Sequence, residues 1–212
     1  MNVQRLAVLG VIGIGIYAYH LGEQPQTTVT GGSLNAAKVP AAYVKLIDKA
    51  ATTCSVLSAP LLAAQFYQES GFNPKAVSGT GAEGITQFEP GTWTTWASPS
   101  YGDGLENPFN PADEIPAAAR FDCALAKQLA NVPGNPVDNM LAGYNAGAKA
   151  VLDDNGIPDN GQTPNYVDSI NALEARFTLA HATPTTTTTT PAPHNPILRE
   201  INGITELIGD VK

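Results

Sequence analysis

Residues 58–74 of the chain read SAPLLAAQFYQESGFNP, and this stretch carries the signals that indicate the class of fold. Ser58 is a residue type that caps helix N-termini, and the proline two positions later suits the first turn of a helix. The helix should end at Gly71, because glycine favours the position after a helix and the Asn-Pro pair that follows does not continue one. The pattern predicts a helix from Ser58 to about Ser70.

Glu69 lies at the end of this predicted helix and shares a face with apolar residues. Leu62, Phe66 and Glu69 fall at positions i, i+4 and i+7, so the face that packs into the core also carries the carboxyl group. Partial removal from water raises the pKa of a carboxyl group and keeps it protonated near neutral pH. The alternative is an exposed glutamate at a helix C-terminus, where the helix dipole disfavours a negative charge. A protonated carboxyl group can donate a proton to a glycosidic oxygen, so Glu69 is a candidate catalytic acid.

Several other segments show helical spacing of apolar residues, and no segment of the sequence alternates as a half-buried strand does. Helices are predicted over residues 40–51, 116–130, 137–145 and 163–177. The fold is therefore predicted to be mainly α-helical.

Length and composition restrict the classes of function. The 212 residues, of which 43% are hydrophobic, allow one domain of ordinary size with tails. The net charge of −8 and the lack of a Lys/Arg cluster argue against a nucleic-acid partner. The three histidines, His20, His181 and His194, lie outside the main helical segment. We therefore expect no metal and no cofactor, and chemistry that depends on carboxyl, hydroxyl and amide groups.

Composition divides the chain into five segments. Residues 1–22 contain an apolar run, residues 23–35 are a polar linker, and residues 36–182 form the folded domain. Residues 183–196 contain six consecutive threonines between prolines and are interpreted as an extended linker. In residues 197–212, Ile and Val recur at intervals of four and three residues, which predicts an amphipathic helix.

Two interpretations of the N-terminal run stay open. Tyr17 and Tyr19 at its end suit a membrane interface, and no small-residue cleavage motif follows. A retained anchor in contact with the membrane is therefore favoured over a cleaved secretory signal. Both interpretations place the rest of the chain outside the cytoplasm. The C-terminal segment would dock on a protein partner or on a second copy of the chain, or else fold back onto the domain.

Cys54 and Cys123 are the two cysteines of the chain. In an exported protein they are expected to form a disulfide bond, because oxidising compartments favour pairing. The alternative is a pair of buried free thiols in a reducing compartment. The apolar N-terminus favours the disulfide.

Four motifs in order carry a resemblance to a known family. They are ESGFNP at 69–74, GAEGITQFEP at 81–90, GYNAG at 143–147 and TPNYV at 163–167. The sequence resembles the soluble lytic transglycosylase (SLT) domain family over roughly residues 43–175. The resemblance implies a single domain with a lysozyme-like fold.

The resemblance also implies a reaction and a set of site residues. Glu69 would be the single acid/base that cleaves the β-1,4 bond between N-acetylmuramic acid and N-acetylglucosamine in peptidoglycan, and the products would have 1,6-anhydromuramoyl ends. Tyr166 would lie beside this carboxyl group, and Ser70 would support the helix end or bind the peptide stem. The residues implied to bind substrate are Ser70, Gln87, Tyr144, Asn145 and Tyr166.

Two departures from the family pattern concern the affinity for sugars. Thr86 stands where a methionine often contacts the sugar, and Gly143 replaces an alanine. Two other functions remain possible on the same fold. One is a lysozyme-type muramidase that uses water as acceptor, and the other is a non-catalytic peptidoglycan-binding scaffold module.

Overall fold

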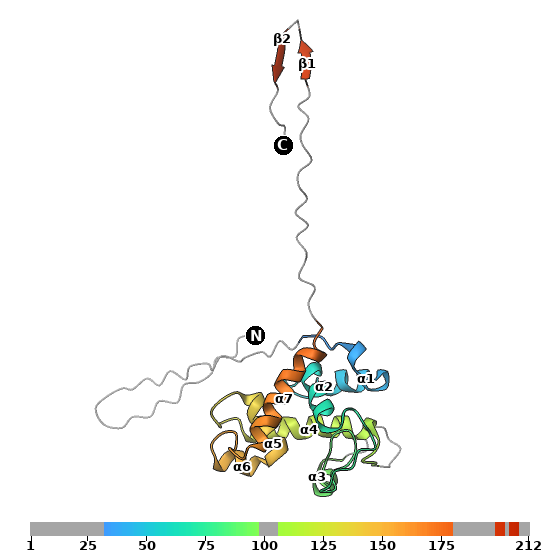
Figure 1. The fold of residues 1–212 in the computed structure, drawn as a ribbon, viewed down its shortest axis with the longest axis vertical. Coiled ribbons are helices and arrows are strands. Elements are labelled where there is room, and N and C mark those ends of the chain that lie inside the picture. The colour runs from blue at the N-terminus through green and yellow to red at the C-terminus, as the bar shows by residue number, and fades with distance from the viewer. Residues whose placement is uncertain (1–31, 98–105, 180–197, 202–203, 208–212) are drawn as a thin grey trace, which may run out of the picture. The chain divides into compact units, whose positions relative to one another are not determined.

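The computed structural model describes residues 32–97, 106–179, 198–201 and 204–207 of the chain. The chain forms two compact units, one up to Leu179 and one from Ala180 onward. The described part of the first unit is helical (Figure 1). In chain order its helices are a 3₁₀ helix (Ala36–Lys38), α1 (Ala41–Ala50), α2 (Ala59–Ser70), α3 (Pro90–Trp96), α4 (Pro111–Gln128), α5 (Pro136–Ala146), α6 (Ala148–Asp153) and α7 (Gln162–Phe177). The prediction of a mainly α-helical domain is confirmed.

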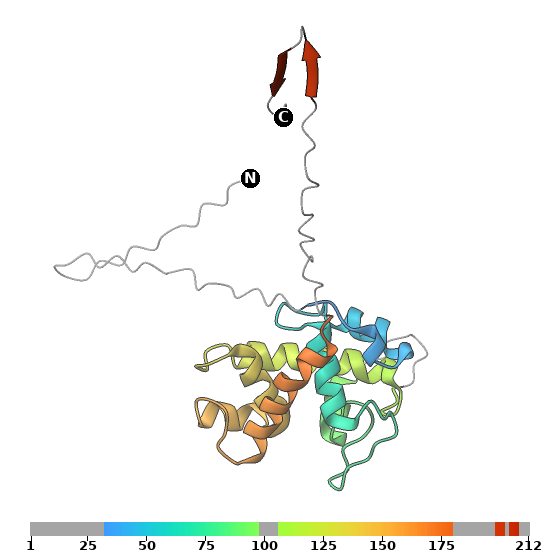
Figure 2. The ribbon, with the colours of Figure 1, turned by 45° about the horizontal axis from the view of Figure 1, so that its top comes forward.

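Helix α2 carries Glu69, and its predicted start and end are confirmed. The Ser58 hydroxyl oxygen accepts a hydrogen bond from the Leu61 amide at 3.0 Å, so it caps the helix. Gly71 ends the helix in the left-handed conformation, with a φ of 62°. Helix α7 lies beside α2 in both ribbon views (Figures 1 and 2).

The hydrophobic core is formed by α1, α2, α4, α5 and α7. Its largest fully buried side chains include Phe66, Ile115, Met140, Ile170 and Phe177. Burial of each such side chain stabilises the fold by about 1.5–3 kcal/mol. This core fixes the end of α2, and with it the position of the candidate acid.

Helix α4 begins earlier than predicted. The Asn110 side chain accepts a hydrogen bond from the Ala112 amide at 3.1 Å, and Pro111 occupies the first turn. This Asn-Pro start is stronger than the predicted start at Pro116, which lies inside the helix. The prediction was wrong because Pro116 was interpreted as a helix start.

The folded domain also includes the last residues of the predicted linker. The Asn35 amide donates to the Phe177 carbonyl at 2.7 Å, and the Leu179 amide donates to the Ser33 carbonyl at 2.8 Å. Leu34 is buried between them. The N-terminal edge of the domain therefore pairs with the end of α7.

The second unit contains two antiparallel strands, β1 (Leu198–Ile201) and β2 (Ile204–Leu207). The amphipathic helix predicted over residues 197–212 is therefore wrong in the described part of that segment. The residues between the strands are Asn202 and Gly203, a pair that favours two-residue hairpin turns and costs a helix about 1 kcal/mol through the glycine. The spacing of the isoleucines alone did not reveal this turn signal.

The predicted disulfide is confirmed, and the predicted tails are not described. Cys54 is bonded to Cys123 and joins the segment after α1 to α4. The predicted anchor (residues 1–22) and Thr/Pro linker (residues 183–196) lie outside the described residues. Within the described ranges, no helix is both long and apolar enough to cross a membrane.

Candidate active site

Glu69 and Tyr166 form the centre of the candidate site. Glu69 is the second-last residue of α2 and is partly buried, and Tyr166 projects from α7. The Tyr166 hydroxyl donates a hydrogen bond to Oε1 of Glu69 at 2.5 Å. Burial raises the pKa of Glu69 to about 7, although the Tyr166 hydrogen bond acts in the opposite direction. Glu69 can therefore hold a proton near neutral pH, and the sequence-based expectation for its pKa agrees with the structure.

Ser70 connects the end of α2 to the loop of residues 81–88. Its hydroxyl lies 2.9 Å from the Ile85 carbonyl oxygen and 3.3 Å from the Phe66 carbonyl oxygen, both of which can accept its hydrogen. The loop is thus held directly against the helix end that carries Glu69. In this structure Ser70 supports the helix end, as one of the two sequence-based interpretations expected.

The same loop is bound by Glu114, a fully buried residue of α4 that sequence reasoning did not identify. The Glu114 carboxyl group accepts hydrogen bonds from the Ile85 amide at 2.9 Å, the Thr86 amide at 3.3 Å and the Thr86 hydroxyl at 3.1 Å. Burial raises the pKa of Glu114 to about 7. A side chain at Gly84 would overlap this carboxyl group and the Pro108 carbonyl. The loop can therefore approach α4 closely only with glycine at this position.

Thr86 has a different environment from the one the family resemblance suggested. Its side chain is fully buried and its hydroxyl is used by Glu114. The exchange of methionine for threonine thus contributes to the anchoring of the loop.

Gln87 adopts a strained backbone conformation, with a φ of 52°. The side-chain nitrogen Nε2 of Gln87 donates a hydrogen bond to the Gly84 carbonyl oxygen at 2.9 Å and lies 3.4 Å from the Ala76 carbonyl oxygen. These contacts fix the side chain and leave its carbonyl oxygen as an acceptor.

Tyr144 and Asn145 lie near the end of α5. The Tyr144 hydroxyl donates to the Thr86 carbonyl at 2.9 Å, and its ring stacks on Phe88 with 5.7 Å between centroids. Burial raises the pKa of Tyr144 well above its usual value, so this hydroxyl stays protonated and keeps donating. The side-chain oxygen Oδ1 of Asn145 accepts a hydrogen bond from the Thr163 hydroxyl at 2.8 Å, which leaves the side-chain nitrogen Nδ2 of Asn145 as a donor.

Gly143 is explained by packing rather than by contact with a sugar. A Cβ atom at this position would lie 2.9 Å from Cδ1 of Leu129 and 3.2 Å from Cδ2 of Leu125. Both leucines belong to the core, so the glycine allows α5 to pack closely on the end of α4.

Asp122 is a second acid that sequence reasoning missed. It lies fully buried on α4, and its Oδ1 accepts a hydrogen bond from Nε2 of Gln65 at 3.2 Å. Burial raises the pKa of Asp122 to about 8, and the charge of Glu69 adds to the effect. A signal was present in the sequence, because Asp122 shares a helical stripe with Ala118 and Leu125.

The structure therefore joins most of the expected residues through one loop. Glu69 and Tyr166 contact each other, whereas Ser70 and Tyr144 both hold the loop of residues 81–88, which carries Gln87. In residues 32–97 and 106–179, no group of three or more His, Cys, Asp or Glu side chains could hold a metal ion.

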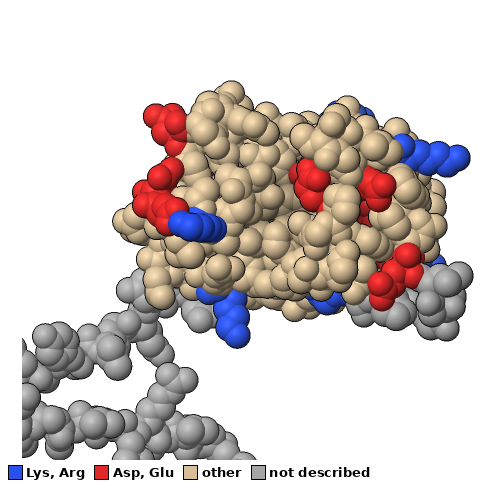
Figure 3. All heavy atoms as spheres, turned by 90° about the horizontal axis from the view of Figure 1, so that it is seen from below, with Lys and Arg blue, Asp and Glu red and all other residues tan. Residues whose placement is uncertain are grey.

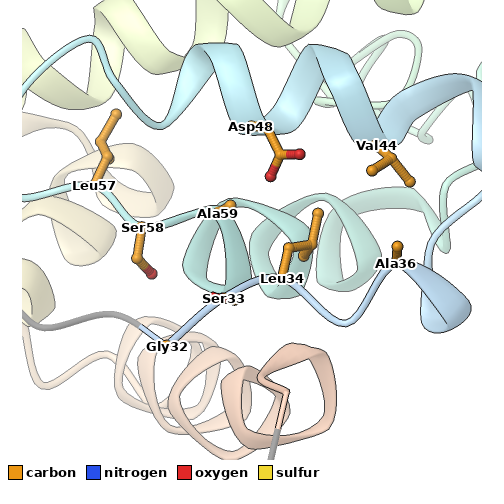
Figure 4. Close-up of a pocket in the computed structure, with 9 residues that line it drawn as sticks. All are labelled: Gly32, Ser33, Leu34, Ala36, Val44, Asp48, Leu57, Ser58 and Ala59. Atoms are coloured by element: carbon orange, nitrogen blue, oxygen red, sulfur yellow. The ribbon is translucent and has the colours of Figure 1, made fainter.

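A pocket of about 480 Å³ lies near the start of α2, away from Glu69. Ser58, Leu34 and Asp48 are among the residues that line it (Figure 4). None of the predicted site residues contributes to it.

Uncharged residues form most of the molecular face seen from below, where acidic side chains are scattered (Figure 3).

Fold and site together define a helical domain organised around one partly buried glutamic acid. The model of the transglycosylase SLT domain family matches residues 45–167. This match covers more than half of the chain, so the chain belongs to the transglycosylase SLT domain family. The family resemblance of the four motifs is confirmed.

Solved structures of lytic transglycosylases have the same fold. The 70 kDa soluble lytic transglycosylase of Escherichia coli is 25% identical, with a TM-score of 0.54, and the match covers 66% of this chain and 24% of that one. A complex of the 70-kDa soluble lytic transglycosylase with bulgecin A gives 27% identity, a TM-score of 0.50 and coverages of 64% of this chain and 24% of that one. An inactive mutant of the Pseudomonas aeruginosa lytic transglycosylase Slt has a TM-score of 0.52 at 24% identity, over 66% of this chain and 24% of that one. The chain therefore matches only about a quarter of the length of these proteins.

Proposed function

We propose that this chain is a peptidoglycan lytic transglycosylase. It would cleave the β-1,4 bond between N-acetylmuramic acid and N-acetylglucosamine and leave 1,6-anhydromuramoyl ends. Family membership supports the class of substrate and reaction. The observation that carries the proposal is the partly buried carboxyl group of Glu69, which has a pKa of about 7 and a hydrogen bond from Tyr166.

The first step uses Glu69 as an acid. Because Oε1 accepts the Tyr166 hydrogen bond, the proton resides on Oε2. Oε2 gives this proton to the glycosidic oxygen, the bond from that oxygen to C1 of the muramoyl residue breaks, and positive charge develops at C1. The acetamido group of the same sugar stabilises this charge.

The second step uses the same carboxylate as a base. It removes the proton from the 6-hydroxyl of the muramoyl residue while that oxygen attacks C1, so the enzyme returns to its protonated state. No carboxylate nucleophile is needed for this sequence. Asp122 and Glu114, whose pKa values burial also raises, are both fully buried and are therefore unsuited to attack a sugar.

The substrate-binding roles follow from the donors and acceptors that the protein leaves available. The Asn145 amide nitrogen would donate to the acetamido oxygen, and the Gln87 carbonyl oxygen would accept from a sugar hydroxyl. Tyr144 and Ser70 would act through the loop that they hold, although Ser70 could also meet the peptide stem. Tyr166 would orient the reacting carboxyl group.

We also propose that the protein works outside the cytoplasm. The disulfide between Cys54 and Cys123 supports an oxidising compartment. The apolar N-terminal run would anchor the chain in the membrane or direct its secretion. The net charge of −8 suits a glycan partner better than a nucleic acid.

The test is mass spectrometry of the products released from purified peptidoglycan by the full chain, by Glu69→Gln and by the control Glu106→Gln at an exposed position. Anhydromuramoyl products from the wild type and the control, and none from Glu69→Gln, are expected. Products with reducing ends would instead indicate a muramidase. A folded protein that sediments with peptidoglycan but releases nothing would indicate a binding module.

A further inference from the structure

Two buried oxygen atoms beneath the candidate site have no hydrogen-bond partner. Asp122 on α4 and Gln65 on α2 are both fully buried and share one hydrogen bond, from Gln65 Nε2 to Asp122 Oδ1 at 3.2 Å. The other polar atom of each side chain, Asp122 Oδ2 and Gln65 Oε1, is buried and unpaired. An ionised aspartate cannot remedy this, because both atoms would then be acceptors.

A single proton on Asp122 can give both unpaired oxygen atoms a hydrogen-bond partner. A proton on Oδ2 of Asp122 turns that atom into a donor, and Oε1 of Gln65 is the unpaired acceptor of the group already bound to it. The carboxylic acid and the amide then form a closed pair with one hydrogen bond in each direction. The neutral form also avoids the large cost of a buried charge that has no cationic partner.

We infer that Asp122 is protonated in the folded protein, that it pairs with Gln65 through two hydrogen bonds, and that this neutral pair positions Glu69. The inference that the pair serves Glu69 rests on the proposed function, whereas the pairing itself does not.

The positions of the two residues explain why the pair would serve Glu69. Gln65 and Glu69 are one helical turn apart on α2. The Gln65–Asp122 pair therefore holds the last turn of α2, which carries Glu69, against α4. The ionisable groups that interact with Asp122 are Glu69 on α2, Tyr144 on α5 and Tyr166 on α7. In the described ranges, neither α1 nor α3 contributes such a group to Asp122.

When Asp122 is neutral, the pKa of Glu69 is set by burial and by the hydrogen bond from Tyr166. A negative charge on Asp122 would oppose the ionisation of Glu69 that takes place in the first catalytic step and produces the carboxylate used in the second. Burial raises the pKa of Asp122 to about 8, so the pair stays neutral where Glu69 titrates, near pH 7. Above about pH 8 the pair should ionise and lose one hydrogen bond.

The first experiment tests the pairing without any need for activity. The stability of Glu69→Gln is compared with that of Glu69→Gln/Asp122→Asn in urea from about pH 5 to about pH 9. The asparagine amide can donate to Gln65 Oε1 at every pH, so the double variant imitates the neutral pair. We expect the unfolding constant of the single variant to rise relative to the double variant by up to about tenfold per pH unit below pH 8. Parallel curves for the two variants would overturn the inference.

The proton can also be observed directly without a substitution at Asp122. The ¹³C resonance of the Asp122 carboxyl group in the full chain should report a protonated acid at neutral pH and titrate near pH 8. A carboxylate signal throughout the range from about pH 5 to about pH 7 would overturn the assignment. This measurement decides the question if the double variant fails to fold.

The second experiment tests positioning. Gln65→Leu removes both hydrogen bonds and is expected to lower kcat by about tenfold while KM changes by less than about twofold, because the reacting carboxyl group is displaced and the sugar contacts are not. Asp122→Asn, which keeps both hydrogen bonds, should retain more of kcat than Gln65→Leu at each pH. Equal losses in the two variants, or a change mainly in KM, would contradict a positioning role. If no variant and no wild-type protein turned over substrate, the proposed function would fail while the stability experiment still decided the pairing.

Discussion

Replacement of Glu69 by glutamine should abolish turnover and also make the folded protein more stable at neutral pH. The folded protein holds the Glu69 carboxyl group in a partly buried position where its pKa is about 7, compared with 4.5 ordinarily. Above pH 4.5 the unfolded chain therefore loses this proton more readily than the folded protein does. The stability that the proton provides is complete below pH 4.5 and is lost as the pH rises to about 7. Glutamine carries no charge and can still accept the Tyr166 hydrogen bond.

The size of the effect follows from the displaced pKa. Each pH unit of difference between the folded and unfolded pKa contributes about 1.4 kcal/mol, so Glu69→Gln should stabilise the fold by about 3 kcal/mol at pH 8 and by close to zero near pH 4. Urea denaturation of the wild type and the variant, at several pH values between these limits, measures this difference. Glu106→Gln, at an exposed position, serves as the control and should show no such dependence.

Two results would contradict this reasoning. A variant that is less stable than the wild type at pH 8 would mean that the Glu69 carboxylate is stabilised by contacts rather than penalised by burial. A stabilisation that is the same at pH 4 and pH 8 would mean that the pKa of Glu69 is not raised, and that packing of the amide causes the effect.

Three further predictions concern the site and its scaffold. Tyr166→Phe removes a hydrogen bond that lowers the pKa of the catalytic carboxyl group, so the alkaline limb of the pH–rate profile should move to higher pH while kcat falls. Gly84→Ala should destabilise the fold by at least about 3 kcal/mol in urea, because its Cβ would overlap the Glu114 carboxyl group at a φ of 71°; wild-type stability would contradict the described loop. Cys54→Ser/Cys123→Ser should lose about 4 kcal/mol, since the bond closes a separation of 69 residues, and reduction of the wild type should give the same loss.

The helix that carries the acid was predictable because its signals are local. Ser58 caps it and Gly71 ends it, as their residue types indicate. Local signals can also compete, and two predictions failed for this reason. The Asn-Pro start at residue 110 outweighed Pro116, and the Asn-Gly pair at residue 202 outweighed the helical spacing of isoleucines in the C-terminal segment.

Sequence reasoning proposed Glu69 as the acid and found the four family motifs, but it missed the buried groups that contact the surrounding loop and helix. Glu114 and Asp122 resemble ordinary charged residues of an amphipathic helix when only the sequence is considered. Their burial depends on the loop and on α2, which approach α4 from distant parts of the chain. The signal that could have revealed Asp122 is its place on an apolar stripe of α4.

The sequence by itself determined the mainly helical class, the family and the position of Glu69 at a helix end, because these depend on the order and spacing of neighbouring residues. Only the tertiary structure decided three hydrogen bonds. Tyr166 donates to Oε1 of Glu69, Thr86 donates to Glu114, and Gln65 donates to Asp122. These contacts join residues from separate helices and loops, and the protonation states at the site depend on burial. An apolar stripe on a helix indicates which face is buried, but the elements packed against that face decide how far each group is removed from water.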